Sequence, residues 1–325
     1  MTAPDSEPSC LVCGSLVRDR FDTVVDGFVV LCCDRCGSAR TWPALDASAI
    51  GSWYPKAYYG DGNVRFNPLF ERLTRWFRRR RVDVIRRSTR PGAVLDVGCG
   101  RGFTLHFLAE AGYRPVGIEL SPLAASHARD VLGLDVRTGD FLSQSFGAGE
   151  FEAVIFWHSL EHVSDPMKAL EHAWEILKPG GLLVVAVPNV SSIQAVTTGR
   201  EWFHLDVPRH YVHFSARGLH DALLRNGFRV LSVAHFNLEQ NPYGWIQSLL
   251  NRVFEHDLLY SMLKEPAARA HRIREFPLQT IASTVAALLL LPLALALVIV
   301  ETLLRRGGTI EVYARKPIDE NSQRR

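Results

Sequence analysis

The sequence predicts an α/β protein built on a doubly wound, mostly parallel sheet of seven strands. Three observations support this prediction. Segments typical of buried strands alternate with helical segments between residues 91 and 237. Within them, the apolar run 94–102 ends in glycines at every second position, as expected of a strand entering a tight turn. A last strand-like segment, residues 308–316, is expected to pair antiparallel with the strand at 229–236.

The composition is that of a globular protein with one strongly basic segment. The 325 residues are 47% hydrophobic and carry a net charge of +3, yet residues 65–90 hold ten arginines against Glu71 and Asp83. The N-terminus has neither the basic start nor the apolar run of a secretory signal peptide. All six cysteines fall within the first hundred residues, so we expect a protein in a reducing compartment, facing the cytoplasm.

Two Cys-x-x-Cys pairs define residues 1–42 as a small N-terminal module, called the cysteine module below. The pairs are separated by 19 residues, a spacing typical of a four-thiolate zinc site. We expect a structural zinc in a zinc-ribbon-like hairpin, with free buried thiols as the alternative. A catalytic zinc is disfavoured because four thiolates leave no open coordination position. The expected ligands are Cys10, Cys13, Cys33 and Cys36.

Residues 43–90 predict an aromatic linker followed by a basic amphipathic helix. In the linker, Tyr58 and Tyr59 are expected either to pack across the next domain or to line a substrate pocket. From residue 66 onward, apolar residues recur at helical spacing and the opposite face is almost all arginine. Such a helix can lie at an anionic membrane surface, bind nucleic acid or cover the domain with a solvated face.

The alternating segment 91–237 places polar residues where its first four strands end or turn. Ligands of parallel sheets bind outside the carboxyl ends of the strands. A carboxylate at Glu119 suits ribose hydroxyls, and Asp140 followed by Phe141 suits an adenine amino group and ring. Helix caps and loop hydrogen bonds are the structural alternatives. The strand-end residues are Asp96, Glu119, Asp140 and Trp157.

The glycine turn, Leu-Asp-Val-Gly-Cys-Gly-Arg-Gly over residues 95–102, resembles motif I of class I S-adenosylmethionine-dependent methyltransferases. It lacks the glycine spacing of dinucleotide sites and the Gly-Lys-Ser/Thr of phosphate loops. With the strand-end residues and EILKPGG at 175–181, the resemblance covers about residues 91–237. It implies a Rossmann-like fold with S-adenosylmethionine as cofactor. The implied cofactor-binding residues are Asp96, Gly98, Gly100, Gly102, Glu119, Asp140, Phe141 and Trp157.

The loop after the fourth strand is expected to face the methyl group. Its sequence, WHSLEHVSDP, lacks the Asn/Asp-Pro-Pro-aromatic pattern of many amino methyltransferases. At Leu160–Val163 it resembles the small-molecule O-methyltransferase group that includes the ubiquinone-type enzymes. The candidate catalytic residues here are Glu161 and His162, with His162 as first candidate for the general base because its ordinary pKa is near neutrality. The alternative is a histidine that only holds the loop by hydrogen bonds.

A second histidine-rich stretch, called the 201–215 segment below, follows the fifth strand. It is dense in His, Arg and aromatic residues, and fold order is expected to return it over the methyl site. His210 is the second candidate base, and Arg209 is a candidate for phosphate or hydroxyl contact. We expect His213 and Ser215 to cap the next helix.

Residues 238–307 predict a hydrophobic helical insertion before the last strand and tail, residues 308–325. Residues 276–300 are uncharged and long enough to span a bilayer. A single crossing, however, would place the last β-strand on the opposite side of the membrane from the sheet that it is expected to join. We therefore expect a helix, broken by Pro292, that dips into or lies on the membrane. A buried or dimerising hairpin and a true span are the alternatives. Arginines suited to anionic head groups flank it: Arg269, Arg272, Arg274, Arg305 and Arg306.

Together these features predict a cytoplasmic methyltransferase associated peripherally or monotopically with the inner face of a membrane. Its expected acceptor is a small molecule or amphiphile, such as a lipid-linked glycan or isoprenoid, methylated on oxygen. The first alternative is a soluble nucleotide-sugar or secondary-metabolite methyltransferase, because the zinc knuckles also resemble nucleotide-sugar C-methyltransferases. The second is a nucleic-acid-binding zinc-ribbon protein, for which the uncharged insertion has no use. We expect no nucleic-acid partner.

Overall fold

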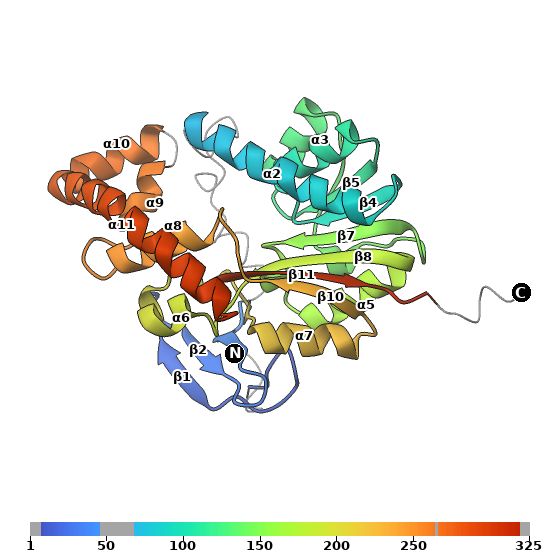
Figure 1. The fold of residues 1–325 in the computed structure, drawn as a ribbon, viewed down its shortest axis with the longest axis horizontal. Coiled ribbons are helices and arrows are strands. Elements are labelled where there is room, and N and C mark those ends of the chain that lie inside the picture. Colours follow the sequence, from blue (N-terminus) through green and yellow to red (C-terminus); the bar gives the residue numbers. More distant parts are fainter. Residues whose placement is uncertain (1–7, 46–67, 264–265, 319–325) are drawn as a thin grey trace, which may run out of the picture.

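In a computed structural model that describes residues 8–45, 68–263 and 266–318, the chain forms a large and a small sheet (Figure 1). The large sheet has seven strands in the order β10-β11-β8-β7-β4-β5-β6, all parallel except β11, so the predicted sheet is confirmed. Its strands are β4 (Ala93–Val97), β5 (Arg114–Glu119), β6 (Asp135–Thr138), β7 (Phe151–Trp157), β8 (Leu177–Pro188), β10 (Arg229–Ala234) and β11 (Thr309–Arg315).

Helices cover both faces of this sheet, as the doubly wound prediction requires. On one face, side chains such as Val94 pack against α2 (Pro68–Ser88), α3 (Phe103–Glu110) and α4 (Pro122–Ser126). On the other, side chains such as Leu95 pack against α5 (Pro166–Ile176) and α7 (Ala216–Arg225). Because neighbouring residues of a strand point to opposite faces, the continuously apolar strands serve two cores.

Two helices change at their C-terminal ends. α5 ends at Ile176, and β8 begins directly at Leu177. Lys178 precedes Pro179, a position that disfavours helical backbone. After α4, residues His127–Val131 continue as a π-helical turn rather than as α-helix.

The cysteine module forms a three-stranded antiparallel sheet that a strand from the larger part of the chain extends. Its strands are β1 (Asp19–Asp22), β2 (Val29–Cys32) and β3 (Ala39–Trp42), so the predicted hairpin is confirmed. β3 also pairs with β9 (Val212–His213), which belongs to the 201–215 segment. The module is thereby joined to the core by backbone hydrogen bonds. The aromatic linker with Tyr58 and Tyr59 lies outside the described residues.

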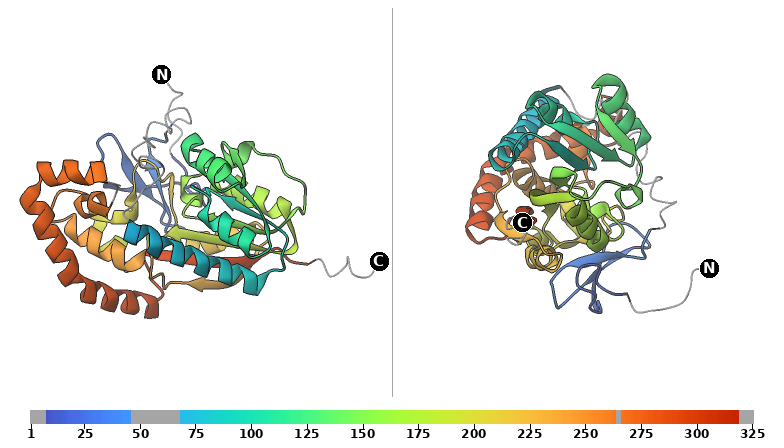
Figure 2. Two further views of the ribbon diagram at one scale, coloured as in Figure 1. Left: turned by 90° about the horizontal axis from the view of Figure 1, so that it is seen from above. Right: turned by 90° about the vertical axis from the view of Figure 1, so that its right-hand side faces the viewer.

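Within the described residues of the insertion there are four helices: α8 (Asn241–Leu250), α9 (Leu258–Leu263), α10 (Pro266–Glu275) and α11 (Pro277–Leu303). The predicted break at Pro292 is wrong, because α11 continues through it as one curved helix (Figure 2). Packing of Ala294 and Val298 against α8 continues beyond the proline and outweighs one lost backbone hydrogen bond. Figure 2 also shows α2 and α11 on one side of the molecule and the cysteine module on another.

Candidate active site

A cavity of about 980 Å³ lies at the carboxyl ends of β4, β5 and β7. Its walls come from the glycine turn, α2, the loop after β7, the 201–215 segment and the insertion. Most predicted site residues meet here, although Gly102 and the four cysteines lie outside the lining. The predicted residues that line it are Asp96, Gly98, Gly100, Glu119, Asp140, Phe141, Trp157, Glu161, His162 and His210.

The three glycines of the turn have different reasons to be glycine. All have left-handed backbones, with φ of 78° at Gly98, 57° at Gly100 and 82° at Gly102. A Cβ on Gly98 or Gly102 would lie 2.6 or 2.7 Å from the Cβ of Ser159 or Ala128, so packing excludes a side chain. A Cβ on Gly100 would meet nothing within 4 Å. Gly100 thus offers backbone to a ligand without a side chain in the way.

Two acidic residues, Asp96 and Glu119, line the cavity beside the glycine turn. Glu119 accepts hydrogen bonds from the backbone N–H of Gly100 and of Ser121, both at 2.8 Å, so it orders the glycine turn while it lines the cavity. Asp96 is buried. Burial raises the pKa of Asp96 to about 7, Glu119 adds to the rise, and Arg81 opposes it.

The two residues expected at an adenine occupy different positions. Asp140 is exposed and lines the cavity. Phe141 also lines it, but its ring is 2% exposed and packs against Phe156 and His172, with centroids 5.5 and 4.9 Å away. Its ring is therefore held mainly by the core.

Two arginines of α2, which the sequence argument assigned to an outer face, line the cavity. Arg81 forms an ion pair with Glu239 and lies 4.1 Å from the centre of the Trp157 ring. Arg78 donates to Thr74 Oγ1 at 3.3 Å and has no ion pair among the described residues. Burial lowers the pKa of Arg78 to about 10. The spacing 74, 78, 81 marks one helix face and is the signal that could have revealed these residues.

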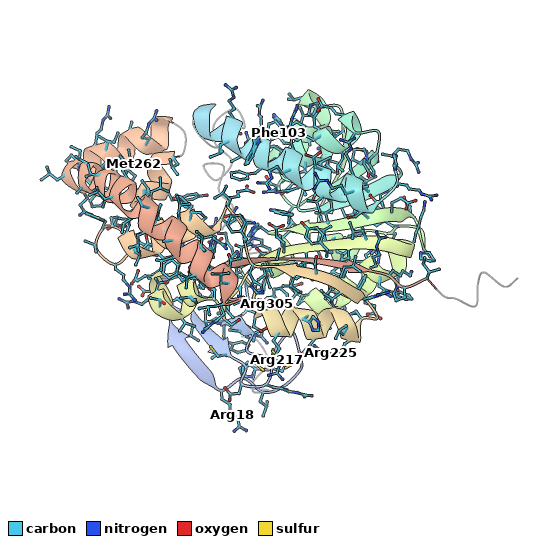
Figure 3. All side chains as sticks on the ribbon, viewed as in Figure 1. Arg18, Phe103, Arg217, Arg225, Met262 and Arg305 are labelled. Atoms are coloured by element: carbon cyan, nitrogen blue, oxygen red, sulfur yellow. The ribbon has the colours of Figure 1, made fainter. Side chains whose placement is uncertain are left out.

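The outer part of α2 mixes arginines with aromatic and aliphatic side chains instead of separating them. Leu73 and Trp76 are exposed, while Arg75 and Arg78 lie over the ring of Phe103 of α3 (Figure 3) at 4.9 and 5.2 Å. Part of the arginine face of α2 therefore packs on the protein instead of facing solvent, because arginine stems lie on the aromatic rings of α3.

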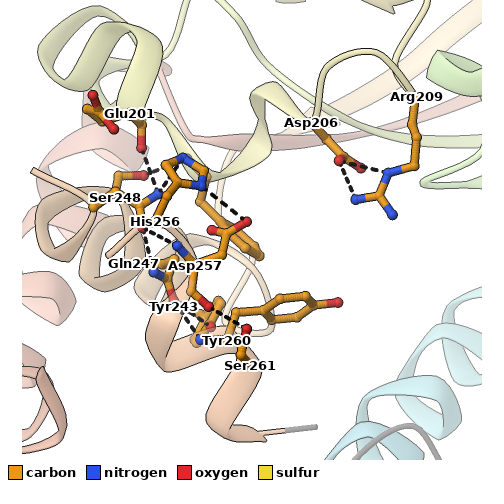
Figure 4. A network of polar contacts seen from close by, with 12 residues as sticks. Glu201, Asp206, Arg209, Tyr243, Gln247, Ser248, His256, Asp257, Tyr260 and Ser261 are labelled. Carbon is orange, nitrogen blue, oxygen red and sulfur yellow. Dashed lines mark hydrogen bonds and ion pairs between the residues drawn. The ribbon is translucent and has the colours of Figure 1, made fainter. Parts of the chain in front are cut away.

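The two candidate bases lie side by side where the loop after β7 meets the 201–215 segment. His162 Nδ1 is 3.0 Å from the carbonyl oxygen of Arg209, and the His162 and His210 rings are 4.6 Å apart. His210 Nε2 lies 3.6 Å from Asp206, which also pairs with Arg209 (Figure 4). Burial, followed by the charge of neighbouring His162, lowers the pKa of His210 well below its ordinary value.

Glu161 is the most deeply buried acid of this cluster, 1% exposed. Burial raises the pKa of Glu161 to about 7, and neither carboxylate oxygen has a hydrogen-bond partner among the described residues. His158 Nδ1 lies 3.5 Å from one of these oxygens. Ligand atoms of Glu161, His162 and His210 lie within 4.8 Å of one another, so this group can hold a proton or a metal ion.

Only one of the two predicted caps exists. Ser215 caps α7 by accepting a hydrogen bond from Gly218 N at 2.8 Å. His213 instead lies with its Nε2 3.0 Å from Thr41 Oγ1 of the cysteine module, so its predicted capping role is wrong. β9 pairs with β3, and this pairing directs His213 away from the helix end.

The four cysteines of the two pairs converge, as predicted. The sulfurs of Cys10 and Cys36 are 3.6 Å apart, those of Cys13 and Cys33 are 3.5 Å apart, and all four lie within 4.8 Å of one another. A tetrahedral zinc with Zn–S bonds of about 2.3 Å needs sulfurs roughly 3.8 Å apart. The donor set and its spacing therefore fit a closed structural zinc site.

Comparison with known proteins identifies the family of the chain. A family described as "Methyltransferase domain" matches residues 69–233. The chain is 33% identical over 148 residues to an uncharacterized 37.1 kDa protein in transposon TN4556 of Streptomyces fradiae, covering 43% of this chain and 40% of that protein. It is 33% identical over 155 residues to the ubiquinone biosynthesis O-methyltransferase of Caulobacter vibrioides, covering 45% of this chain and 61% of that enzyme. It thus spans less than two thirds of either relative.

A solved structure supports the fold. The complex between the Haloferax volcanii Trm112 methyltransferase activator and a methyltransferase contains a chain that superposes with a TM-score of 0.50. The match has 19% sequence identity and covers 80% of this chain and 96% of that one. At this identity the likeness concerns the fold alone.

Proposed function

The chain belongs to the methyltransferase-domain family as a class I S-adenosylmethionine-dependent methyltransferase, and on that premise we propose O-methylation of a membrane-associated amphiphile. The observation that supports this proposal is that a single cavity is bordered both by the glycine turn and by the apolar insertion. The glycine turn lies at one end of it, and the insertion that carries the exposed apolar helix α11 forms another wall. The acceptor is of the class of lipid-linked glycans and isoprenoids.

The cofactor end is assigned to groups that match the parts of S-adenosylmethionine. Gly100 offers a backbone that a ligand can approach closely, and Glu119 beside it accepts ribose hydroxyls. Asp140 accepts from the adenine amino group. Arg78, a cation without an ion pair among the described residues, neutralises the methionyl carboxylate. When bound, the cofactor supplies an electrophilic methyl group whose departing sulfur takes the electron pair.

His162 is assigned as the general base. A carbonyl oxygen can only accept, so the contact with Arg209 places a hydrogen on Nδ1 and the basic lone pair on Nε2. His162 Nε2 takes the proton that the acceptor hydroxyl loses as its oxygen bonds to carbon. His210 packs on the His162 ring and orients it. Buried Glu161, when ionised, stabilises the resulting imidazolium, because opposite charges attract strongly where solvent is excluded.

Membrane association is assigned to α11 and its arginine neighbours. α11 is the one helix among the described residues that is long and apolar enough to cross a bilayer, yet only 17% of its most apolar window is buried. Glu301, fully buried near its C-terminal end, accepts from Trp245 Nε1 at 3.0 Å and ties that end to α8. Because the end of α11 is held by the protein, we assign α11 to the membrane surface and not to a crossing.

The cysteine module is assigned a structural zinc, which supports the fold and takes no part in methyl transfer. Four thiolates complete a tetrahedral site, so no position remains for a substrate. The inner face of the cytoplasmic membrane is the proposed location, because free thiols suited to zinc persist in a reducing compartment and the arginines suit anionic lipids.

Vesicle flotation with a surface-only variant tests the membrane part of the proposal. Ile281, Leu288 and Leu289 are exposed on α11, so changing all three to Ser should leave packing on α8 intact. Wild type should float with phosphatidylglycerol vesicles and the triple variant should stay in solution. The matched control changes three other exposed aliphatic residues to Ser, namely Val196, Leu224 and Leu231. Equal flotation of all three proteins, or none by wild type, would refute membrane docking through α11.

Transfer of a radiolabelled methyl group tests the chemistry. The probes are a polyprenyl-phosphate-linked hexose and a polyprenylated dihydroxybenzoate, each in vesicles. Label should pass to an oxygen of at least one of them, as shown by mass spectrometry of the product. Label on nitrogen or carbon alone, or in neither lipid, would contradict the proposed function.

A further inference from the structure

The wall of the cavity formed by the insertion is a cluster of three aromatic rings. Phe203, Tyr243 and Tyr260 all line the cavity. The Phe203 ring lies edge-to-face with those of Tyr243 and Tyr260 at centroid distances of 5.1 and 5.4 Å. These rings come from the 201–215 segment, α8 and α9 respectively, so the insertion contributes two of the three. These rings are large and rigid, and Glu239, Gln240, His256 and Asp257 of the insertion add polar groups to the same wall.

A network of buried amides holds this wall in place (Figure 4). Gln247 Oε1 of α8 accepts from the Tyr243 hydroxyl and from the backbone N–H of Tyr260, both at 2.9 Å. Asn251 Oδ1 accepts from Gln247 Nε2 at 2.6 Å and from Asp257 N at 3.0 Å. Gln247 and Asn251 are both buried, so the rings and Asp257 are fixed before any ligand arrives.

Several polar atoms that line the same cavity are buried without a hydrogen-bond partner among the described residues. His204 is 6% exposed and its Nε2 has no partner. The same holds for side-chain atoms of seven other lining residues: Arg81 Nε, Trp157 Nε1, His158 Nε2, Ser159 Oγ, both carboxylate oxygens of Glu161, Trp202 Nε1 and Asp257 Oδ1. Each such atom has lost its contact with water and gains a partner only when something else hydrogen-bonds to it. A ligand that satisfies donors and acceptors together needs hydroxyl groups, which do both.

We infer that the α8–α9 part of the insertion is the acceptor subsite and that the acceptor presents a hydroxyl-rich ring, that is, a sugar. A sugar carries hydroxyls around its whole edge, which suits polar atoms spread over eight residues, and its C–H faces pack on aromatic rings. A prenylated dihydroxybenzene has two oxygens side by side and leaves most of these atoms unpaired. This inference rests on the proposed methyl transfer and narrows its acceptor from the two classes named above to one.

Saturation-transfer NMR tests the subsite directly. The probes are methyl α- and β-glycosides of the common hexoses and deoxyhexoses, with a prenylated dihydroxybenzoate as competitor class, all with S-adenosylhomocysteine present. At least one glycoside should bind wild type. Tyr260→Ala and Asp257→Asn should each raise its dissociation constant about tenfold. Val253→Ala is the matched control, because Val253 lies in the same connection, is 75% exposed and does not line the cavity.

Two further probes distinguish a soluble sugar acceptor from a lipid-linked one. A nucleoside-diphosphate hexose in solution and a polyprenyl-phosphate hexose in vesicles are compared as methyl acceptors. Preference for the first assigns the subsite to a soluble sugar donor, and preference for the second to a lipid-linked glycan. Methylation of either one with loss of activity in Tyr260→Ala supports the sugar subsite.

The outcomes that overturn the inference differ from those that overturn the proposed function. If no glycoside binds, or if the dihydroxybenzoate is methylated equally by wild type and both variants, the sugar subsite is wrong while methyl transfer stands. If S-adenosylhomocysteine itself does not bind, the cofactor site and the proposed function fail. Calorimetry with S-adenosylhomocysteine on all four proteins is therefore the first measurement, and the three variants should bind it like wild type.

Discussion

Thr41 of the cysteine module donates a hydrogen bond of 2.6 Å to the backbone carbonyl oxygen of His210 in the candidate active site. Its hydroxyl oxygen also lies 3.0 Å from His213 Nε2. Since the hydroxyl hydrogen goes to the carbonyl, His213 must donate through Nε2. Tyr211, between these histidines, bonds through its N–H to the carbonyl oxygen of Glu161 at 2.9 Å. One threonine therefore joins the module to the segment that lies over the candidate base.

Removing the Thr41 hydroxyl should weaken both folding and catalysis. Thr41→Val leaves two buried polar groups unpaired, so we expect a loss of about 1–3 kcal/mol in the free energy of unfolding, measured by urea denaturation. A shift of the His210 backbone should lower kcat without changing cofactor affinity by calorimetry. Thr302→Val is the control, because that hydroxyl donates to Val298 within α11. Unchanged kcat in Thr41→Val would show that the module does not position the site.

Gly100→Arg should abolish cofactor binding. The left-handed backbone at Gly100 costs a non-glycine residue roughly 1–2 kcal/mol, and the side chain would enter the cavity. Gly112→Arg is the matched control, because Gly112 has a φ of +85° and open space around it but does not line the cavity. Titration calorimetry with S-adenosylmethionine should show binding in the control only. Equal affinity of both variants for S-adenosylmethionine would show that the cofactor does not bind at the glycine turn.

Replacing the two candidate bases should separate their roles. His162→Ala should lower kcat by about 10²–10⁴, the usual contribution of a general base, with cofactor affinity unchanged. His210→Ala should have a smaller effect, because burial keeps that imidazole neutral and it acts by orienting His162. The kcat of His210→Ala should retain the pH dependence of wild type. The kcat of His162→Ala should no longer show the fall toward low pH that protonation of a general base causes. Full activity in both variants would contradict general-base catalysis by His162.

Asp96 should make stability depend on pH in a defined direction. Burial raises its folded-state pKa from 3.8 to about 7, so the folded protein holds this proton more tightly than the unfolded chain. Its contribution is complete below pH 3.8 and is lost as pH rises through about 7, by roughly 4 kcal/mol at most. Urea denaturation of wild type against Asp96→Asn should therefore show the variant gaining relative stability between pH 5 and pH 8.

The control for the Asp96 experiment is Asp135→Asn, at an exposed position on β6. It should follow wild type across the same pH range. A pH profile of Asp96→Asn that is parallel to wild type would mean that Asp96 is ionised in the folded protein throughout.

The zinc assignment predicts one ion per chain. Cys13→Ser should lose the metal, measured with a zinc-sensitive dye after denaturation, and should lower the midpoint of thermal unfolding. Cys32→Ser is the matched control, because Cys32 neighbours Cys33 but is not part of the converging group. A chelator should reproduce the effect of Cys13→Ser in wild type. Wild type without zinc after growth in zinc-supplemented medium would contradict the assignment.

The large sheet could be predicted because its information is local. Continuous apolar runs, the glycine turn at 98–102 and the strand-ending carboxylates appear within short windows of sequence. The insertion was also visible, because α11 is uncharged as far as Val300. The effect of Pro292 was not, because whether a helix survives a proline depends on packing beyond it, here that of Ala294 and Val298 against α8.

The candidate site divides in the same way. Glu119, Asp140 and His162 could be named because each follows a recognisable strand. Arg78 and Arg81 could not be separated from the other arginines of α2, because only the docking of the helix decides which face meets the cavity. The aromatic wall was missed because Phe203 and Tyr260 are far apart in the chain and meet only when the insertion folds back.

The sequence by itself determined the sheet, the glycine turn and the pairing of the cysteines, since each depends on residue types at short, regular spacing. The tertiary structure alone decided that β3 of the cysteine module pairs with β9, that two arginines of α2 line the cavity, and that the insertion forms one of the cavity walls. The physical reason is that these features are contacts between segments far apart in the chain, and such contacts are selected by burial and hydrogen bonding of the whole fold.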